Sequence, residues 1–210
     1  MAIETWLLYA VTVFFVSATP GPNMLLAMTH GIQHGFRPAL VTSLGLMSGL
    51  GIVMGASSAG LGALLAASEQ AFVAMKLAGA AYLIYLGVKV WRADPERIRT
   101  DAVGPGRAGT WARFRTGVLV SISNPKAFVF FTALFPQFLD SSRPQAPQFA
   151  VLVTTFVVIE SAWQLIYAGG GARLAHWLDS EPRLRLVNRL SGGAFVAAGL
   201  LLTAASRRGP

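Results

Sequence analysis

Cysteine is absent from the 210 residues, and charged residues make up only 12% of them. The missing cysteine excludes disulfides, thiolate metal sites and thiol redox chemistry. Soluble domains carry about twice this share of charged residues. Apolar residues account for 54% of the chain, and they gather in long stretches with little charge, which is typical of membrane-spanning helices. The sequence therefore predicts an all-α integral membrane protein in contact with the lipid bilayer.

Acidic residues and histidines are also scarce, with nine Asp and Glu against 17 Lys and Arg, and three His. A basic face on a soluble domain would indicate nucleic-acid binding, but these basic residues lie in loops between apolar stretches. We therefore expect no nucleic-acid partner. His30 and His34 have the spacing of a helical metal pair without a carboxylate beside them. We assign them to an interfacial loop and expect no metal and no cofactor.

Six apolar stretches are long enough to cross a bilayer as helices. They cover residues 5–28, 38–65, 71–91, 114–138, 148–171 and 189–205. Residues 92–113, with their Pro, Gly and mixed charges, predict a cytoplasmic linker between a first half, 1–91, and a second half, 114–210.

An internal repeat supports this division into halves. Residues 76–83 (KLAGAAYL) match residues 189–196 (RLSGGAFV), and Pro20 corresponds to Pro125. Because each copy contains an odd number of spans, three, the second copy inserts upside down relative to the first. The expected architecture is two inverted three-helix repeats, a recurrent design of transporters.

The first and fourth apolar stretches are each interrupted by proline, at residues 19–23 (TPGPN) and 124–126 (NPK). Proline removes a backbone donor, and such breaks are tolerated at membrane depth only where neighbouring groups satisfy the freed carbonyls. Matching breaks in two halves indicate a substrate site, although a kink used only for packing is the alternative. The residues expected to bind substrate here are Thr19, Pro20, Gly21, Pro22, Asn23, Asn124 and Pro125. A helix restarting near Met24 would direct its amides at an anionic group.

Two ionisable residues lie deep in the predicted spans. Lys126 costs about 2.5–3.5 kcal/mol at this depth, so we expect it to attract a bound anion or to form a structural ion pair. Glu160 is the only acid deep in a span, where low dielectric favours the protonated carboxyl group. We expect it to couple transport to protons, to pair with Lys126, or to bond between helices as a neutral acid. Gln164 lies one turn further along the same face and is a further candidate for substrate binding.

Small residues recur at a spacing of four in the second apolar stretch, as Gly45 with Gly49 and Gly51 with Gly55. Such pairs let helices pack closely in membranes, and we expect both to do so.

Several of these motifs together resemble the LysE/RhtB family of bacterial amino-acid exporters. The resemblance runs from about residue 4 to about residue 205, and its most specific elements are residues 17–23 (SATPGPN), 34–37 (HGFR), 77–87 (LAGAAYLIYLG) with 91–92 (WR), 124–127 (NPKA) and 134–138 (LFPQF). The family often has an acid in the fifth span seven residues before a Tyr. Here Glu160 precedes Tyr167 by seven residues, where the family pattern leads us to expect Asp.

The resemblance implies a secondary-active exporter of amino acids or related metabolites in the bacterial inner membrane, driven by proton antiport. The substrate site would lie at mid-membrane, where the two breaks meet. A passive small-solute channel of the same fold is the alternative function. An enzyme is not expected, because three His, no Cys and one deep acid leave too few groups for catalysis. Assembly into a homo-oligomer is left open.

Both termini are predicted to lie outside the cytoplasm. Twelve Lys and Arg lie in the linker and in the first and fifth loops with their flanks, against four on the opposite side, and cytoplasmic loops retain such residues. Reporter fusions at Pro210 and at Gly104 test this orientation. A cytoplasmic signal from the fusion at Pro210 would mean that a span has been miscounted.

Overall fold

The computed structural model describes residues 1–93, 109–140 and 143–206, and every regular element in these ranges is helical. The elements are α1 (Ile3–Ala18), α2 (Pro22–His34), α3 (Phe36–Ala67), α4 (Glu69–Arg92), α5 (Thr110–Ile122), α6 (Pro125–Val129), the π-helical η1 (Phe130–Leu134), the 3₁₀-helical η2 (Phe135–Phe138), α7 (Gln145–Leu178) and α8 (Glu181–Ser206). The prediction of an all-helical protein is therefore confirmed. The linker expected at 92–113 is shortened at both ends, and its residues 94–108 lie outside the described part of the chain.

The two predicted breaks are present, because the first and fourth apolar stretches each form a bent pair of helices. The axes of α1 and α2 meet at 52°, and those of α5 and the 125–138 segment meet at 54°. Each bent pair is long and apolar enough to be one broken span, and α3 and α7, the latter kinked at Gly171, are each long and apolar enough to cross a membrane as single helices. Helices α4 and α8 do not reach the same length and hydropathy over their described residues, so their membrane crossing stays a prediction.

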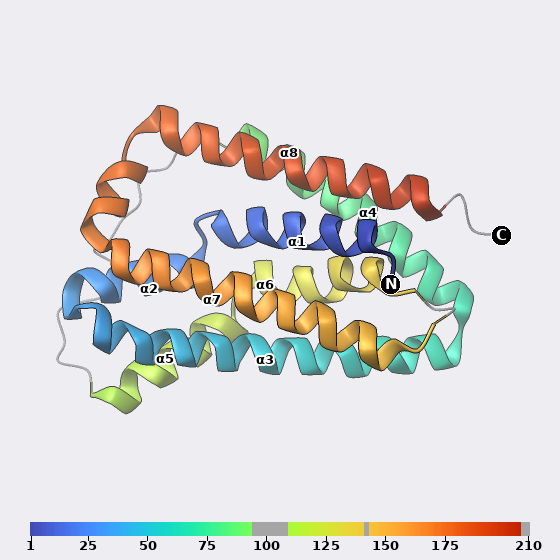
Figure 1. The fold of residues 1–210 in the computed structure, drawn as a ribbon, viewed down its shortest axis with the longest axis horizontal. Helices are drawn as coiled ribbons and strands as arrows, with labels where there is room; N and C mark the ends of the chain where they lie inside the picture. Colours follow the sequence, from blue (N-terminus) through green and yellow to red (C-terminus); the bar gives the residue numbers. More distant parts are fainter. Residues whose placement is uncertain (94–108, 141–142, 207–210) are drawn as a thin grey trace.

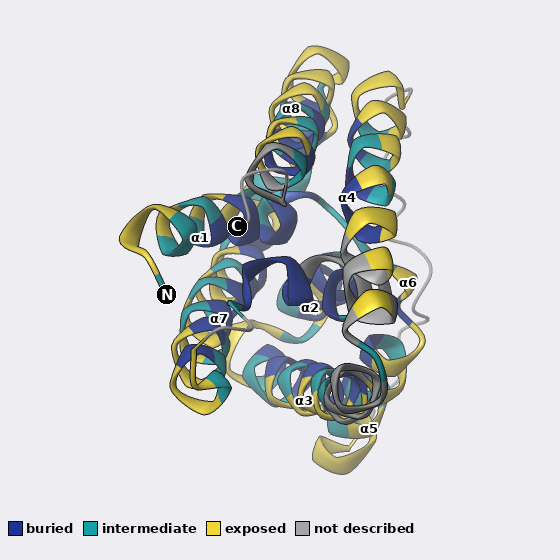
Figure 2. Cartoon of the chain, turned by 90° about the vertical axis from the view of Figure 1, so that its right-hand side faces the viewer, coloured by how far each residue is buried: buried dark blue, intermediate teal, exposed yellow. Residues whose placement is uncertain are grey.

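The helices run along the long axis of the molecule, and the loops gather at its two ends (Figure 1). The N-terminus and the C-terminal end of α8 lie at one end, and the α2–α3 and α7–α8 connections lie at the other. Two of the loops that the charge count assigns to the cytoplasm, the α2–α3 and α7–α8 connections, thus share one end. Exposed residues lie on the outward faces of the helices (Figure 2). Leu44, Leu119 and Val158 are among the exposed apolar ones. Apolar exposure along the whole bundle is what a lipid-facing surface requires.

Pairs of helices pack in defined directions. Trp6 Nε1 donates to Thr155 Oγ1 and Tyr167 OH donates to Ala18 O, with the same sequence separation of 149, so α1 and α7 run parallel. On α4, a Cβ atom added to Gly87 would lie 2.7 Å from Gly192 O of α8. On α8, a Cβ atom added to Gly199 would lie 2.9 Å from Ala80 O of α4. Helices α4 and α8 are therefore antiparallel and packed backbone to backbone, as two inverted copies of one motif would be. The inverted repeat itself stays a prediction.

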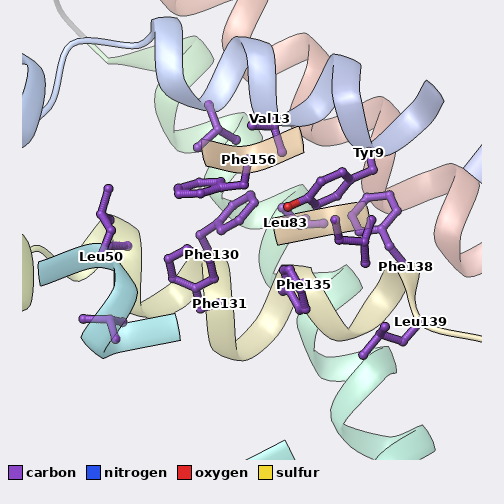
Figure 3. Close-up of a cluster of buried hydrophobic side chains, with 14 of the residues drawn as sticks. Tyr9, Val13, Leu50, Leu83, Phe130, Phe131, Phe135, Phe138, Leu139 and Phe156 are labelled. Atoms are coloured by element: carbon purple, nitrogen blue, oxygen red, sulfur yellow. The ribbon is translucent and has the colours of Figure 1, made fainter. Parts of the chain in front are cut away.

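An aromatic cluster fills the space between α1, α4, the 125–138 segment and α7 (Figure 3). The ring of Tyr9 packs edge-on against those of Phe135 and Phe138, with centroid distances of 6.1 and 4.9 Å. Phe131 packs in the same manner against Phe156 on α7. Because aromatic rings bury large areas and prefer these edge-to-face contacts, the cluster holds the second half of the broken span against α1 and α7.

Glycine spacing allows α3 and α5 to pack closely, but only one of the two expected glycine pairs takes part. A Cβ atom on Gly45 would lie 2.1 Å from Phe114 O, and one on Gly49 would lie 2.6 Å from Ser121 Cβ. No atom lies within 4 Å of the Cβ positions of Gly51 and Gly55. The expectation that Gly51 and Gly55 serve packing was wrong, because these two face away from the partner helix.

Gly45→Ala is predicted to destabilise the protein, and Gly51→Ala is its matched control on the same helix. The new methyl group at residue 45 must displace the backbone of α5, and overpacking of this kind costs about 1–3 kcal/mol. Thermal unfolding of detergent-purified protein measures the difference. Equal melting temperatures for the two variants would contradict the close approach of α3 and α5.

Candidate functional site

The first break follows directly from the missing donors of Pro20 and Pro22. In an α-helix the carbonyl of residue i accepts from the N–H of residue i+4, so these prolines leave Val16 O and Ala18 O without their helical partners. Side chains from distant helices replace both donors. Lys126 Nζ donates to Val16 O and, at 3.0 Å, to Thr19 O, and Tyr167 OH donates to Ala18 O at 2.8 Å.

The second break is organised by Asn124. Its side chain caps α6 by accepting from the backbone N–H of Lys126 at 3.0 Å, and Pro125 occupies the first helical turn, where its missing N–H would have no helical partner. The same arrangement occurs at the first break, where Pro22 opens α2 after the extended Gly21. Both halves thus restart a helix at a proline.

The two breaks meet through buried amide side chains. Asn124 Nδ2 donates to Asn23 Oδ1 at 2.9 Å, and Asn23 Nδ2 donates to Ser121 Oγ at 3.0 Å. Ser121 Oγ in turn donates to Leu46 O on α3 at 2.8 Å. Asn23, Asn124 and Ser121 are each less than 5% exposed. Because a buried amide without partners is costly, this chain of bonds fixes the spacing of α2, α3, α5 and α6.

A small cavity of about 30 Å³ lies where the breaks meet. Its polar lining consists of Gly21, Asn23, Asn124, Lys126 and Glu160. Its apolar lining consists of Val16, Met24, Leu50, Ala127, Phe130, Phe131 and Phe156, several of which appear at the left of Figure 3. A volume of this size holds a water molecule but no amino acid. The cavity therefore combines a charged side with an aromatic side.

The two charged residues of the cavity do not form a direct ion pair. Lys126 and Glu160 are described residues, yet their charged atoms lie more than 4.0 Å apart, and the ion pair found in the described part of the chain joins Arg143 to Asp140 instead. The Lys126 ammonium group sits on the last carbonyls of α1, where the helix dipole favours a cation. Glu160 is only 6% exposed. The expected pairing of Lys126 with Glu160 is thus absent from this conformation.

Three buried polar residues share one face of α7, namely Glu160, Gln164 and Tyr167. They follow each other at spacings of four and three, which places them one above the other on a helix. Gln164 Nε2 lies 3.4 Å from Glu160 Oε1 and 3.4 Å from Met47 Sδ. Polar side chains thus extend along this face of α7 from Glu160 to Tyr167, which bonds to the α1 break through Ala18 O.

Half of the residues expected at the site line the cavity, and half do not. Thr19, Pro20, Pro22, Pro125 and Gln164 are not part of its lining, and Pro22 and Pro125 are exposed. The prolines shape the site by withholding donors, because a pyrrolidine ring has no polar atom to offer. Sequence reasoning missed Ser121, Tyr167 and the aromatic wall. Of these, only Tyr167 could have been identified from the sequence, because it follows Glu160 at the seven-residue spacing of the family pattern.

We expected His30 in an interfacial loop, and this was wrong. His30 lies inside α2 and is only 3% exposed. Its Nδ1 lies 2.6 Å from Thr42 Oγ1 on α3, and its ring packs edge-on against His34. Within the described part of the chain, no three His, Cys, Asp or Glu side chains are arranged to hold a metal ion. His30 therefore joins α2 to α3 by a buried hydrogen bond.

Tyr167→Phe is predicted to lower the melting temperature, because Ala18 O would lose the donor that replaces the missing Pro22 amide. A buried carbonyl without a partner costs about 1–3 kcal/mol. Tyr85→Phe is the control, since Tyr85 is 58% exposed. Thermal unfolding of both purified variants tests the assignment, and a Tyr167→Phe protein as stable as the control would refute it.

Comparison with known proteins places the chain among membrane translocators. A family model for the LysE type translocator matches residues 14–206. The homoserine/homoserine lactone efflux protein of Salmonella typhimurium is 36% identical over 206 residues, which cover 98% of both chains. The leucine efflux protein of the same organism is 30% identical over 193 residues, covering 90% of this chain and 89% of the relative.

An uncharacterized membrane protein of Vibrio cholerae is 36% identical over 98% of this chain and 99% of its own length. No solved structure matches the sequence. Because the family model covers almost the whole chain and the relatives align from end to end, this protein belongs to the LysE family of translocators, a family of bacterial membrane exporters.

Proposed function

We propose that this protein exports amino acids with uncharged side chains, and close derivatives of them, across the bacterial inner membrane in exchange for protons. The observation that carries the proposal is the cavity where the two broken helices meet, with Lys126 and Glu160 on its polar side and Phe130 and Phe156 on its apolar side. An amino acid has the matching composition, with a carboxylate, an ammonium group and a side chain. The names of the relatives, which refer to homoserine, homoserine lactone and leucine efflux, agree with this class.

The lining suggests how such a substrate would lie. Its carboxylate would face the Lys126 ammonium and the first turn of α2, where helix amides and a cation both favour an anion. Asn23 and Asn124 would bond to its polar groups, and its ammonium would face Glu160. The side chain would then lie against the aromatic wall. Glu160 is the only acid among the lining residues, so a second positive charge on the substrate would have no partner.

Transport requires a change of conformation, because the cavity of about 30 Å³ is too small for an amino acid. We propose that the two halves rock against each other around the fixed meeting point of the breaks. The 130–138 segment would move together with the aromatic cluster into which its phenylalanines pack, since its π- and 3₁₀-helical turns have weaker hydrogen-bond geometry than an α-helix. Its phenylalanines extend from Phe130 and Phe131, which line the cavity, toward Phe138 beside Tyr9 in the N-terminal half of α1 (Figure 3).

Proton coupling would follow from competition at Glu160. In a buried site the carboxyl group is stable either when protonated or when a cation lies beside it. A bound ammonium group would therefore release the proton, and the departing substrate would let another bind. One charge moved across the membrane contributes about 2.3 kcal/mol per 100 mV, which supports an accumulation of tens-fold.

Reconstitution in liposomes tests the function and separates it from the passive channel. Purified protein should exchange external for internal leucine or homoserine, and an imposed proton gradient should accumulate the substrate inside the liposomes. A channel would equilibrate the solute, show no accelerated counterflow and ignore uncouplers. Metabolite profiling of a cell that lacks its own exporters and expresses this protein would extend the substrate range. Absence of any amino acid from the exported pool would reject the proposal.

Lys126→Ala is predicted to abolish export while the protein still inserts into the membrane, because removal of a buried cation favours insertion and eliminates the attraction for the substrate carboxylate. Loss of a charged hydrogen bond corresponds to a decrease in affinity of at least about tenfold. Lys126→Gln removes the positive charge but keeps an N–H donor for Val16 O. This variant therefore separates the effect of the charge from that of the hydrogen bond. Lys89→Ala on α4 is the exposed control. Normal export by well-expressed Lys126→Gln protein would reduce Lys126 to a helix cap.

Glu160→Gln is predicted to retain substrate exchange at saturating concentration but to lose gradient-driven accumulation. The amide resembles the protonated acid and cannot release a proton, whereas exchange needs no net proton movement. Both activities are measured in the same liposomes, with and without a pH gradient. Survival of accumulation in this variant would show that the proton is carried elsewhere.

A further inference from the structure

Three oxygen-bearing side chains gather where the end of α1 approaches the middle of α7. Ser17 lies beside the Glu160 carboxyl group, and Gln164 follows Glu160 one turn later on α7. All three are buried, with exposures of 1% for Ser17, 6% for Glu160 and 1% for Gln164. Of the three, Glu160 lines the cavity, so the group adjoins the space proposed for substrate through this carboxyl group, while Ser17 and Gln164 lie behind the lining.

These side chains are poorly satisfied by the protein itself. Ser17 Oγ and Gln164 Oε1 are buried without a hydrogen-bond partner. Glu160 Oε1 receives a long contact of 3.4 Å from Gln164 Nε2, Ser17 lies near the carboxyl group without meeting hydrogen-bond geometry, and the Lys126 ammonium lies beyond 4.0 Å. A buried polar atom without a partner costs about 1–3 kcal/mol. Such atoms clustered around one carboxyl group indicate that something else completes the site.

We infer that Ser17, Glu160 and Gln164 form a subsite for a primary ammonium group, which the α-amine of the substrate supplies. A primary ammonium carries three N–H donors, one for each of the three oxygens. A proton on Glu160 would add a single donor to this group, whereas an ammonium group adds three. Magnesium would need about six oxygen ligands, twice the number present. An ammonium head is also close in size to the water molecule that the cavity accommodates.

The subsite deepens the proposed function and rests on it for the identity of the amine. It defines the substrate class more narrowly, as molecules with a free primary amine. Substitution of hydrogen by methyl or acetyl removes a donor that one of the three oxygens needs. Because a hydrogen bond to a charged group contributes about 1.5–3 kcal/mol, each lost bond should weaken binding about tenfold or more. Removal of the Ser17 or Gln164 oxygen should have the same effect from the protein side.

Binding to the purified, full-length protein tests the subsite independently of transport. The probes are n-butylammonium, tetramethylammonium and sodium as chloride salts, and L-leucine with its amine-free analogue 4-methylpentanoate. Thermal stabilisation is measured against probe concentration for the unaltered protein, Ser17→Ala and Gln164→Leu. Ser48→Ala is the matched control, because Ser48 is exposed and bonds only to its own helix. If Ser17→Ala does not yield folded protein, Gln164→Leu decides the question.

The expected result is stabilisation by n-butylammonium and leucine at concentrations about tenfold higher in Ser17→Ala and Gln164→Leu than in the control. If tetramethylammonium stabilised the protein as much as n-butylammonium does, the site would recognise positive charge without N–H donors. If sodium stabilised the protein more than n-butylammonium does, the site would be a metal-ion site. Either result would overturn the inference, as would unchanged binding in both variants. No stabilisation of the unaltered protein by n-butylammonium would overturn it too.

Transport measurements separate this inference from the proposed function. If n-butylammonium binds as expected but liposomes move neither leucine nor homoserine, the proposed export fails and the ammonium subsite stands. If leucine is transported with the same half-saturation concentration in Gln164→Leu as in the control, export stands and the subsite fails.

Discussion

The absence of backbone donors at Pro20 and Pro22 is the constraint on which the centre of this protein depends. Inside a bilayer no water satisfies the carbonyl groups that these prolines leave open, so other parts of the chain must come to them. Lys126 reaches Val16 O from the second half, and Tyr167 reaches Ala18 O from α7. The need for two donors therefore brings together the broken first helix, the broken fourth helix and α7, which together surround the cavity.

This arrangement gives Lys126 a structural and a chemical role at once. Its ammonium group is held by the carbonyl end of α1, which offsets part of the cost of burying a cation. Because those carbonyls are acceptors with only partial charge, the positive charge remains available to an anion in the cavity. Glu160, by contrast, has no cation within 4.0 Å. The cavity is thus asymmetric, with a fixed cation and a carboxyl group in need of a partner.

The structure also separates rigid from movable parts of the proposed transport cycle. Asn23, Asn124 and Ser121 lock the breaks to α3 and α5 by buried hydrogen bonds, and glycine contacts hold α3 against α5 backbone to backbone. The helical geometry is irregular in the π- and 3₁₀-helical segment 130–138, which under our proposal moves with the aromatic cluster, and at Gly171, where α7 continues through a kink with φ of +37°. Both irregular places lie outside the hydrogen-bonded centre.

The sequence by itself determined the helical class and the position of both breaks. These features depend on local chemistry: proline lacks a donor wherever it stands, and apolar length decides which segments span a membrane. The family and most of the polar side of the cavity could be predicted for the same reason. Only the tertiary structure decided which groups satisfy the freed carbonyls, which glycines pack, that Lys126 and Glu160 stay apart, and that Ser17, Ser121 and Phe130 join the site. Each of these depends on the distance between segments far apart in the chain, which no local pattern specifies.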